Sequence, residues 1–424
     1  MKEEFLYYIW QHQLFNRTDL SLSSGESLSI LKPGLRNLHN GPDFKEAHLV
    51  IEGIQWHGAV EMHVNASDWL KHGHQTDVNF DNVILHVVFQ NDRDIELGGS
   101  IIPTLEVKGI YKPKVYHRYM NLIENPGKVP CAQQLGQVSA LTRLSMLEAV
   151  LIERLKRKSK GIEADLIDTS YDWQEAAFRK LAEGLGFKTN SRGMYQLAKL
   201  CSLKLLNKQS TLIRKEALLL GLGGFLQGRF KDEYMLSLQH EYEFLKKKYI
   251  LKKELTVHDW KFSPIRPFNY PAFRIAQLAA LIHTFPNLWE KFLNNDKFDH
   301  LTTSLQVESS GYWQSHFRPE KEAKVSSSKL SQNAINNLLI NVTAPLLLAY
   351  SQYTGNYVYT ERALNLLSSL KVETNRITKL WKELNWRMSS AFDTQGLNEL
   401  YSQYCQKTRC LDCKIGHQLI RSES

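Results

Sequence analysis

The stretch Ala47-His-Leu-Val-Ile-Glu-Gly-Ile-Gln-Trp-His-Gly-Ala-Val-Glu-Met-His-Val64 places two apolar, strand-like runs on either side of Glu52-Gly53. Such runs favour β-structure, and a dipeptide that ends in glycine suits a tight turn between them. The sequence therefore predicts a β-hairpin with strands at 47–52 and 54–64. The residue numbers of paired positions then sum to about 105, which places Asp43 opposite Met62.

Asp43 and Glu61 are the carboxylates that this hairpin brings near each other. A shift of one residue reverses the face of a strand, so a plain register separates them, whereas a bulge brings them together. Both registers stay open at this point. Two adjacent carboxylates can bind a divalent cation, which activates water and stabilises charge on a phosphate. His63 is two residues after Glu61 and shares its face.

The segments around the hairpin predict a mixed first part and a helical second part. An amphipathic helix is expected over 3–14, and a short helix capped by Ser67 or Asp68 within the polar stretch 65–82. Additional strands are expected at 27–31, 83–89 and 101–107. After the punctuated segment 124–130, helical periodicity takes over, with amphipathic helices expected at 141–158, 173–185, 212–225, 233–247, 273–283, 334–350, 361–370 and 373–384. We predict an α+β domain at 1–128 followed by an all-α domain at 129–424.

Length and composition exclude several classes of protein. The chain has 424 residues, of which 43% are hydrophobic and 23% charged, so it is not largely disordered. We read no apolar run near the ~18 residues that span a bilayer, and we expect a cytoplasmic protein without a membrane partner. Its five cysteines are too few and too unevenly spaced for a disulfide framework.

The net charge of +9 is unevenly distributed. Residues 1–128 carry a balance of −4 and nine of the 15 histidines, while residues 129–424 carry +13. This asymmetry points to DNA or RNA as a partner of the basic part, although solvated helices rich in lysine explain it equally. The basic stretches 154–160 and 246–248 are expected at helix ends, where cations favour the helix dipole.

A second group of polar residues follows the hairpin. His74 and Asp77 are candidates for a metal ligand or a general base, with a solvated loop as the alternative. His72 is expected to belong to that loop. His86 falls inside a strand-like run and is expected in the core.

At these residues the sequence resembles the PD-(D/E)xK phosphodiesterase superfamily, the restriction-endonuclease-like fold. Pro42-Asp43 matches the first half of its motif, and Glu61-x-His63 matches the second half except at the lysine. The resemblance implies a mixed sheet with flanking helices and a nuclease whose Mg²⁺ or Mn²⁺ is held by Asp43 and Glu61, with Glu3 or Glu4 of the first helix as a further acid. His63 would then be a ligand or a proton shuttle, Lys45 would supply the missing cation, or activity has been lost.

The whole chain also resembles domain-of-unknown-function family 2851, a bacterial family found mainly in Bacteroidetes with no assigned reaction. The residues that carry this resemblance include Gly41-Pro-Asp-Phe44, Trp56-x-Gly58-x-Val-Glu61-x-His63, Asp68-Trp69-x-x-His72-Gly-His74-x-x-Asp77, Leu85-His-Val-Val88, Pro130-Cys131, Arg266-Pro267-x-Asn269, Tyr312-Trp313-x-x-His316 and the last three cysteines.

Those cysteines form the pattern Cys405-x4-Cys410-x2-Cys413. In a reducing compartment such thiols favour coordination of zinc or an iron–sulfur cluster, with reduced, idle thiols as the alternative. Cys131 and His417 are the candidates for a fourth ligand. This arrangement, one upstream cysteine and three near the C-terminus, is similar to that of some nucleases related to the superfamily above. The resemblance implies a 4Fe–4S cluster.

Taken together, the sequence predicts a metal-dependent phosphodiesterase or nuclease that acts on nucleic acid. Asp43 and Glu61 would hold Mg²⁺ or Mn²⁺, and His63, His74 and Asp77 would tune the metal or the water. One alternative is a non-catalytic nucleic-acid-binding or scaffold protein with a degenerate endonuclease-like domain. Another is a hydrolase of a different phosphorylated substrate. Oligomeric state stays open.

Overall fold

The computed structural model describes residues 1–125, 127–294, 298–325 and 327–422. Its contacts divide the chain into two compact units: unit 1, Met1–Met146 with Leu400–Ser424, and unit 2, Leu147–Glu399. Unit 1 therefore extends past the predicted boundary at 128 and includes the C-terminal segment. Pro126, within the predicted boundary segment, lies outside the described residues.

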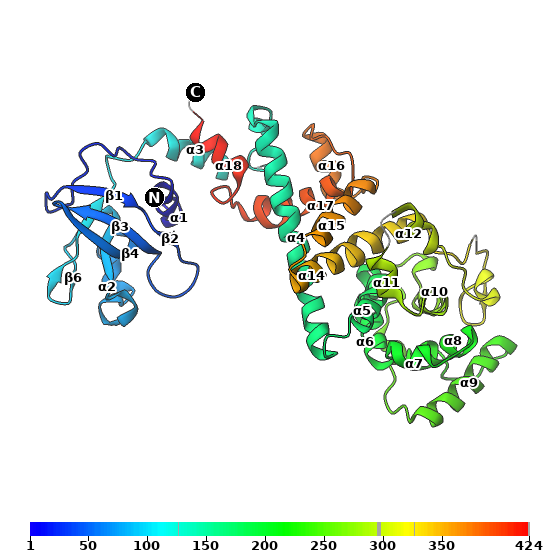
Figure 1. Cartoon of the computed structure of the whole chain (residues 1–424). Coiled ribbons are helices and arrows are strands. Elements are labelled where there is room, and N and C mark those ends of the chain that lie inside the picture. The colour runs from blue at the N-terminus through cyan, green and yellow to red at the C-terminus, as the bar shows by residue number, and fades with distance from the viewer. Residues whose placement is uncertain (126, 295–297, 326, 423–424) are drawn as a thin grey trace. The chain divides into compact units, whose positions relative to one another are not determined.

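Unit 1 is built on a mixed sheet in the strand order β1-β3-β4-β5-β8, with the short β2 paired to β3. The β3–β1 and β3–β4 pairs are antiparallel, and the β4–β5 and β5–β8 pairs are parallel. Figure 1 shows these strands in blue, with α1 beside them. Their bounds are β1 Leu28–Lys32, β2 Leu35–Arg36, β3 Phe44–Ile51, β4 Ile54–Asn65, β5 Val83–Gln90 and β8 Thr104–Glu106.

The predicted hairpin is confirmed in turn and register. Glu52 and Gly53 both have positive φ, and Ile51 pairs with Ile54. The register that pairs Ala47 with Gly58 shifts by one residue before Phe44, which pairs with Val60. The extra residue forms a β-bulge in β3, so the structure has the bulged of the two registers left open by the sequence.

The remaining elements of unit 1 flank this sheet. The apolar face of α1 is buried, with Phe5, Leu6, Ile9 and Trp10 fully enclosed. Near the other end of the unit's chain, α18 packs against α3 (Figure 1). The bounds are α1 Glu3–Gln11, α2 Asp68–Lys71, η1 His74–Thr76, η2 Val78–Phe80, β6 Glu96–Leu97, β7 Ser100–Ile101, α3 Pro113–Ile123, η3 Ala132–Gln137, η8 Leu400–Tyr404, η9 Cys405–Lys407 and α18 Lys414–Arg421.

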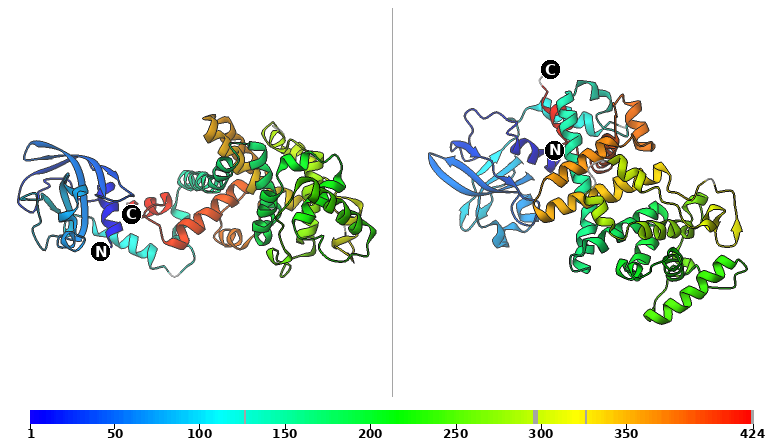
Figure 2. Two further views of the ribbon diagram at one scale, coloured as in Figure 1. Left: turned by 90° about the horizontal axis from the view of Figure 1, so that it is seen from below. Right: turned by 45° about the vertical axis from the view of Figure 1, so that its right-hand side comes forward.

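Unit 2 is almost entirely helical, as both views in Figure 2 show. The predicted α+β organisation is thus confirmed at this level, except that the second part also holds a small hairpin, β9 His316–Arg318 with β10 Lys321–Glu322. Its longer helices are α5 Trp173–Leu185, α6 Phe187–Leu200, α7 Leu203–Asn207, α8 Leu212–Leu222, α9 Glu233–Tyr249, α10 Pro271–Thr284, α11 Leu288–Leu293, α12 Phe298–Ser304, α13 Gln332–Leu338, α14 Ala344–Thr354, α15 Val358–Ser369, α16 Arg376–Glu383 and α17 Ala391–Glu399. The short helices are η4 Val257–Asp259, η5 Pro267–Asn269, η6 Gly311–Gln314 and the π-helix η7 Leu339–Thr343.

The basic stretch 154–160 was expected at a helix end, and this prediction is wrong. It lies inside the long helix α4, Ala140–Asp168, which passes from unit 1 into unit 2. Arg154 and Arg157 both bind the buried carboxylate of Glu399, at 3.0 and 2.6 Å. This pairing explains why Arg154 and Arg157 occur in the middle of a helix.

One helical stretch, Gln332–Thr354, is long and apolar enough to cross a membrane, with a mean hydropathy of 1.3. The sequence predicted a helix at 334–350 within this stretch, but an apolar stretch of this length was not expected. It is composed of α13, η7 and α14, and 72% of its most apolar window is buried inside the structure. That burial is what a core helix shows, so the stretch is weak evidence for a membrane span.

Gly58 allows β4 and β5 to approach closely where the hairpin leads into the parallel pair. A Cβ atom at this position would lie 2.5 Å from both the Asn82 carbonyl oxygen and the Ile84 Cγ2. We therefore expect Gly58→Ala to lower the free energy of unfolding by about 1–3 kcal/mol through overpacking. Gln55→Ala, at an exposed position of the same strand, is the control, with a change within about 0.5 kcal/mol. Urea unfolding of both variants measures the difference, and equal stabilities would contradict the proposed role of Gly58.

Candidate metal and acid site

The bulge at the start of β3 brings Asp43 to Glu61. The Asp43 backbone N–H donates to Glu61 Oε2 at 3.0 Å, and Asp43 Oδ2 accepts from the Met62 N–H at 3.1 Å. The Glu61 carboxylate is thus bound to the backbone of Asp43, and the Asp43 carboxylate to the backbone of Met62, the residue after Glu61. Glu61 is only 5% exposed, so its carboxyl group is buried in the sheet face.

The electrostatics of this acid pair are unfavourable to two negative charges. Burial raises the pKa of Asp43 to about 6, although the Tyr7 hydroxyl and the Met62 N–H stabilise its charged form. Burial, followed by repulsion from Asp43, raises the pKa of Glu61 to about 9. The α1 residue Glu3 adds repulsion to both carboxyls. A bound cation would offset the cost of burying these charges and the repulsion between them, so the two carboxyl groups fit a metal ion as its ligands.

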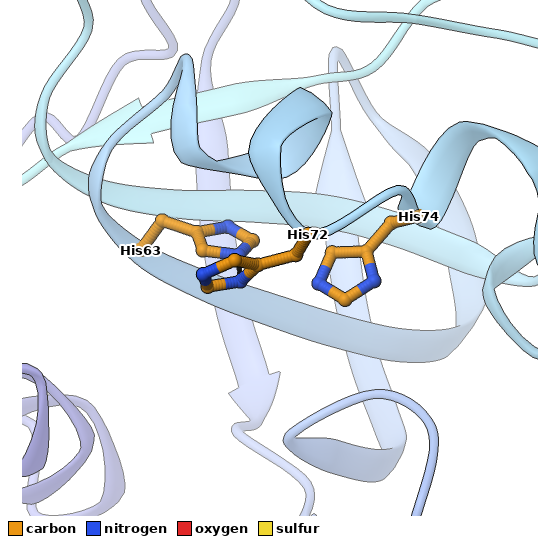
Figure 3. A group of neighbouring side chains, drawn as sticks. All are labelled: His63, His72 and His74. Atoms are coloured by element: carbon orange, nitrogen blue, oxygen red, sulfur yellow. Dashed lines mark hydrogen bonds between the residues drawn. The ribbon is translucent and has the colours of Figure 1, made fainter.

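The other carboxylate oxygen of Glu61, Oε1, faces a group of histidines. Glu61 Oε1 lies 3.3 Å from His74 Nε2 and 3.8 Å from His63 Nε2. His63 Nε2 in turn lies 3.1 Å from His72 Nδ1. One ligand nitrogen from each of the three histidines lies within 4.8 Å of the others. Figure 3 shows His63 on its strand and the rings of His72 and His74 projecting from the neighbouring loop.

The loop that carries His72 and His74 is fixed by an apolar anchor. Trp69 of α2 is fully buried and packs with Ala59, Phe80 and Val88. His72 ends α2, and His74 begins η1 after a single glycine. The His74 ring stacks on Phe80, with ring centroids 3.9 Å apart. Packing of Trp69 therefore directs both imidazoles back toward β4.

His86 on β5 contacts the His63 ring and fixes its orientation. Glu61 and His86 are partners across the parallel β4–β5 pair, so they occupy one face of the sheet. His63 Nδ1 lies 2.9 Å from His86 Nε2. Burial first, and then the neighbouring histidines, lower the pKa of His63 to about 3, and burial and His74 lower that of His86 to about 3. Burial also lowers the pKa of His74. These three rings are neutral at pH 7, the state in which imidazole binds metal.

Two of the predicted site residues lie outside this arrangement. The Asp77 carboxylate caps η2, where it accepts from the Asn79 backbone N–H at 3.0 Å and from the Asn79 side chain at 2.8 Å. Lys45 is exposed on β3. Of the two acids proposed in the first helix, Glu3 interacts with the pair, while Glu4 is exposed and interacts with Tyr119 instead.

Sequence reasoning missed three residues of the site: Tyr7, Arg36 and His72. Arg36 lies over the Tyr7 ring, 4.8 Å from its centroid, and its charge favours ionised Asp43. Its strand β2 is only two residues long, too short for a periodicity signal. His72 was expected to be an ordinary loop residue. The signal that could have found it was its spacing of two from His74.

The four predicted metal-ligand cysteines gather at a second position in unit 1. Cys131, Cys405, Cys410 and Cys413 line a cavity of about 20 Å³ together with Pro130, Tyr404 and Gly416. A Cβ atom on Gly416 would lie 2.1 Å from the Cys410 carbonyl oxygen, so only glycine lets α18 pack this closely. The cysteines approach from two segments that are distant in sequence.

The thiols influence one another electrostatically. Burial raises the pKa of Cys131 and of Cys410 to about 12, and in both cases the Cys413 thiol adds to the effect. Burial raises the pKa of Cys405 and Cys413 as well, while backbone N–H groups of Gly416 and Ile415 favour the Cys413 thiolate. His417 lies elsewhere: its Nδ1 is 2.9 Å from the Tyr8 hydroxyl and its Nε2 3.1 Å from Arg421. Cys131 is thus the fourth member of this group.

Comparison with known proteins adds one match. The chain matches no curated protein and no solved structure. A family model described as "Protein of unknown function (DUF2851)" matches residues 3–376. The matched range includes the acid pair, the histidines and Cys131, and ends before the last three cysteines. Because the match covers well over half of its residues, the chain belongs to the DUF2851 family.

Proposed function

We propose that this protein is a metal-dependent phosphodiesterase that cleaves nucleic acid at the Asp43–Glu61 pair. The observation that carries the proposal is the burial of two neighbouring carboxyl groups, each held by a backbone N–H, with raised pKa values. Keeping both groups ionised at such a buried position is costly without a cation. A restriction-endonuclease-like sheet, expected from the order of helix and strands, would present them at its edge.

The chain's own residues would position substrate and water. The backbone N–H groups of Asp43 and Met62 orient the two carboxylates, and the Tyr7 hydroxyl bonds to Asp43. Arg36 offers a permanent cation near the pair, which the superfamily's lysine would otherwise supply and neutral His63 does not. Mg²⁺ or Mn²⁺, when bound there, supplies charge neutralisation for the phosphate and a more acidic water.

In the proposed reaction the oxygen of a water molecule bonds to phosphorus while one P–O ester bond breaks. The products are a phosphomonoester and an alcohol, and the proton lost by water balances the proton gained by the leaving oxygen. His74, partly exposed beside Glu61, is placed to exchange a proton with solvent. His63 is too deeply buried for that exchange and is better suited to hold a ligand position.

The partner proposed from the charge distribution is DNA or RNA. Unit 2 carries 36 Lys and Arg against 26 Asp and Glu, whereas unit 1 carries 17 against 18. A cavity of about 670 Å³ in unit 2 is lined by Arg154, Arg157, Lys158, Lys180 and Lys188. Asn341 of the π-helix η7 bonds to the Lys158 ammonium at this cavity. Cations around a recess are suited to phosphate oxygens.

We further propose that the four cysteines hold a metal centre. Two buried and two half-buried cysteines around a small cavity form a soft donor set that suits zinc or an iron–sulfur cluster. The layout of one upstream and three C-terminal cysteines, which is similar to that of some nucleases, is the ground on which we propose an iron–sulfur cluster.

The carboxylate pair is tested by isosteric variants. Asp43→Asn and Glu61→Gln should each reduce Mg²⁺- or Mn²⁺-dependent cleavage of labelled DNA and RNA at least about 100-fold, because each removes a charged ligand. Glu46→Gln, an exposed acid on the same hairpin, is the matched control and should cleave like the wild type. Equal cleavage by all four proteins would exclude the site. Nucleic-acid binding without cleavage in any of them would instead support the non-catalytic alternative.

The basic cavity is tested by charge removal at two of its lysines. Burial lowers the pKa of Lys158 to about 7, so the assay is made at pH 6, where both ammonium groups are charged. There Lys158→Met with Lys188→Ala should weaken binding of a DNA duplex, and should reduce the slope of log affinity against log salt concentration by about 1–2. Lys252→Ala with Lys253→Ala removes the same charge from an exposed stretch of unit 2 outside the cavity lining. Fluorescence anisotropy at several salt concentrations measures both pairs. Identical slopes in the two double variants would contradict a role for the cavity.

The cysteine centre is tested by metal analysis of anaerobically purified protein. We expect iron and acid-labile sulfide with a visible absorption band, and we expect Cys131→Ser and Cys413→Ser each to lose most of the iron. Cys201→Ser is the control, because Cys201 is fully buried in the separate core of unit 2. Zinc in place of iron would overturn the cluster assignment, and no metal at all would identify the residues as idle thiols.

A further inference from the structure

We infer that Glu61, His63, His72 and His74 form a binding site for a first-row transition-metal ion, with Zn²⁺ as the representative ligand. The inference shares Glu61 with the proposed phosphodiesterase site and so rests in part on the same residue. It does not require phosphodiester hydrolysis, because metal binding is measured separately. It adds a metal class that differs from the Mg²⁺ expected at the carboxylate pair.

The spacing of the donor atoms supports a single ion. His63 Nε2 and His72 Nδ1 are 3.1 Å apart, Glu61 Oε1 and His74 Nε2 are 3.3 Å apart, and Glu61 Oε1 and His63 Nε2 are 3.8 Å apart. A tetrahedral zinc ion with bonds of about 2.0–2.1 Å has ligand atoms roughly 3.4 Å from one another. Two of these three distances are close to the edge of that tetrahedron and the third is longer, and one ligand nitrogen of each histidine lies within 4.8 Å of the others. Figure 3 shows the three rings side by side.

The chemistry of the donors selects the metal. Three imidazoles with one carboxylate suit Zn²⁺, Co²⁺ or Fe²⁺, whereas Mg²⁺ and Mn²⁺ prefer oxygen ligands. Glu61 can serve both metal classes because its two oxygens face different groups. Oε2 accepts from the Asp43 N–H, while Oε1 faces the histidines.

The surroundings of the histidines are those of supported ligands. The other nitrogen of His63, Nδ1, is hydrogen-bonded to fully buried His86, which leaves Nε2 directed at the site. Metal-bound histidines are commonly oriented in this way by a second residue. His74 Nε2 is buried and, although Glu61 Oε1 lies 3.3 Å away, forms no hydrogen bond with it; a cation between the two atoms would satisfy both. The stacked Phe80 ring fixes the orientation of His74.

A metal ion at this position would link two segments of unit 1. Glu61 and His63 belong to β4, whereas His72 and His74 belong to the loop between α2 and η1. This loop is attached to the sheet chiefly through Trp69 and Phe80. Binding would therefore hold the loop to the strand and raise the thermal stability of the whole chain in a concentration-dependent way.

The test is Zn²⁺ binding to the full chain after chelator treatment. Calorimetry measures the binding of Zn²⁺, and the visible spectrum reports the binding of Co²⁺ in its place. The double variant His72→Ala/His74→Ala should bind one equivalent fewer than the wild type, or bind it at least about 100-fold more weakly. His48→Ala/His57→Ala is the matched control, because those rings stack 3.9 Å apart on the same hairpin, away from the site. The difference between the two double variants isolates this site from any metal at the cysteines.

The outcomes separate this inference from the proposed function. Equal Zn²⁺ stoichiometry and affinity in both double variants would overturn it. His72→Gln/His74→Gln provides a second variant of closer size, and circular dichroism of the apo proteins confirms that each is folded. Asp43→Asn should abolish cleavage yet keep the Zn²⁺ equivalent. A third outcome is that Asp43→Asn loses cleavage while the wild type binds no Zn²⁺ at the histidines. That outcome would reject the transition-metal site and leave the phosphodiesterase proposal standing.

Discussion

The burial of the Glu61 carboxylate is the constraint on which the site depends. A carboxyl group that is 5% exposed must be protonated, hydrogen-bonded or neutralised by a cation, and the chain supplies a backbone N–H on one side and imidazoles on the other. The bulge in β3, the glycine at 58 and the buried Trp69 each set the position of one of these partners. A plain hairpin with the same composition would separate the two carboxylates and leave Glu61 without the Asp43 N–H.

The same constraint links the two proposed metal classes. Glu61 has two oxygens and two sets of neighbours, so a change at one side alters the charge felt at the other. Oxygen ligands from Asp43 and nitrogen ligands from the histidines select different ions by their hardness. A chain that places both sets around one carboxylate can respond to the supply of two metals rather than one.

The parts of the fold that depend on neighbouring residues were predictable from sequence. The hairpin turn at Glu52-Gly53, the register of its strands and the exact span of α5 follow from local composition and periodicity. The bulge could be predicted only as one of two registers, because a single inserted residue does not change the pattern of apolar residues along the strand.

Arg36 and His72 were missed because a two-residue strand and a short loop are too short to show a periodic pattern of apolar residues. Asp77 was grouped with the histidines by proximity in sequence, whereas its side chain caps a turn. The association of Cys131 with the tail came from residue type and from the resemblance to nucleases with one upstream and three C-terminal cysteines, since no local signal brings together segments so far apart.

The split composition of unit 1 has a consequence for how the protein is made. Residues 400–424 belong to a unit whose other residues are 1–146, and the whole of unit 2 lies between them in the sequence. A ribosome therefore releases the sheet first, the helical unit second and the cysteine-bearing tail last. The surface of unit 1 that contacts η8, η9 and α18 therefore stays uncovered while more than 250 further residues are synthesised. Slow translation of unit 2 would prolong that interval and so delay the completion of unit 1.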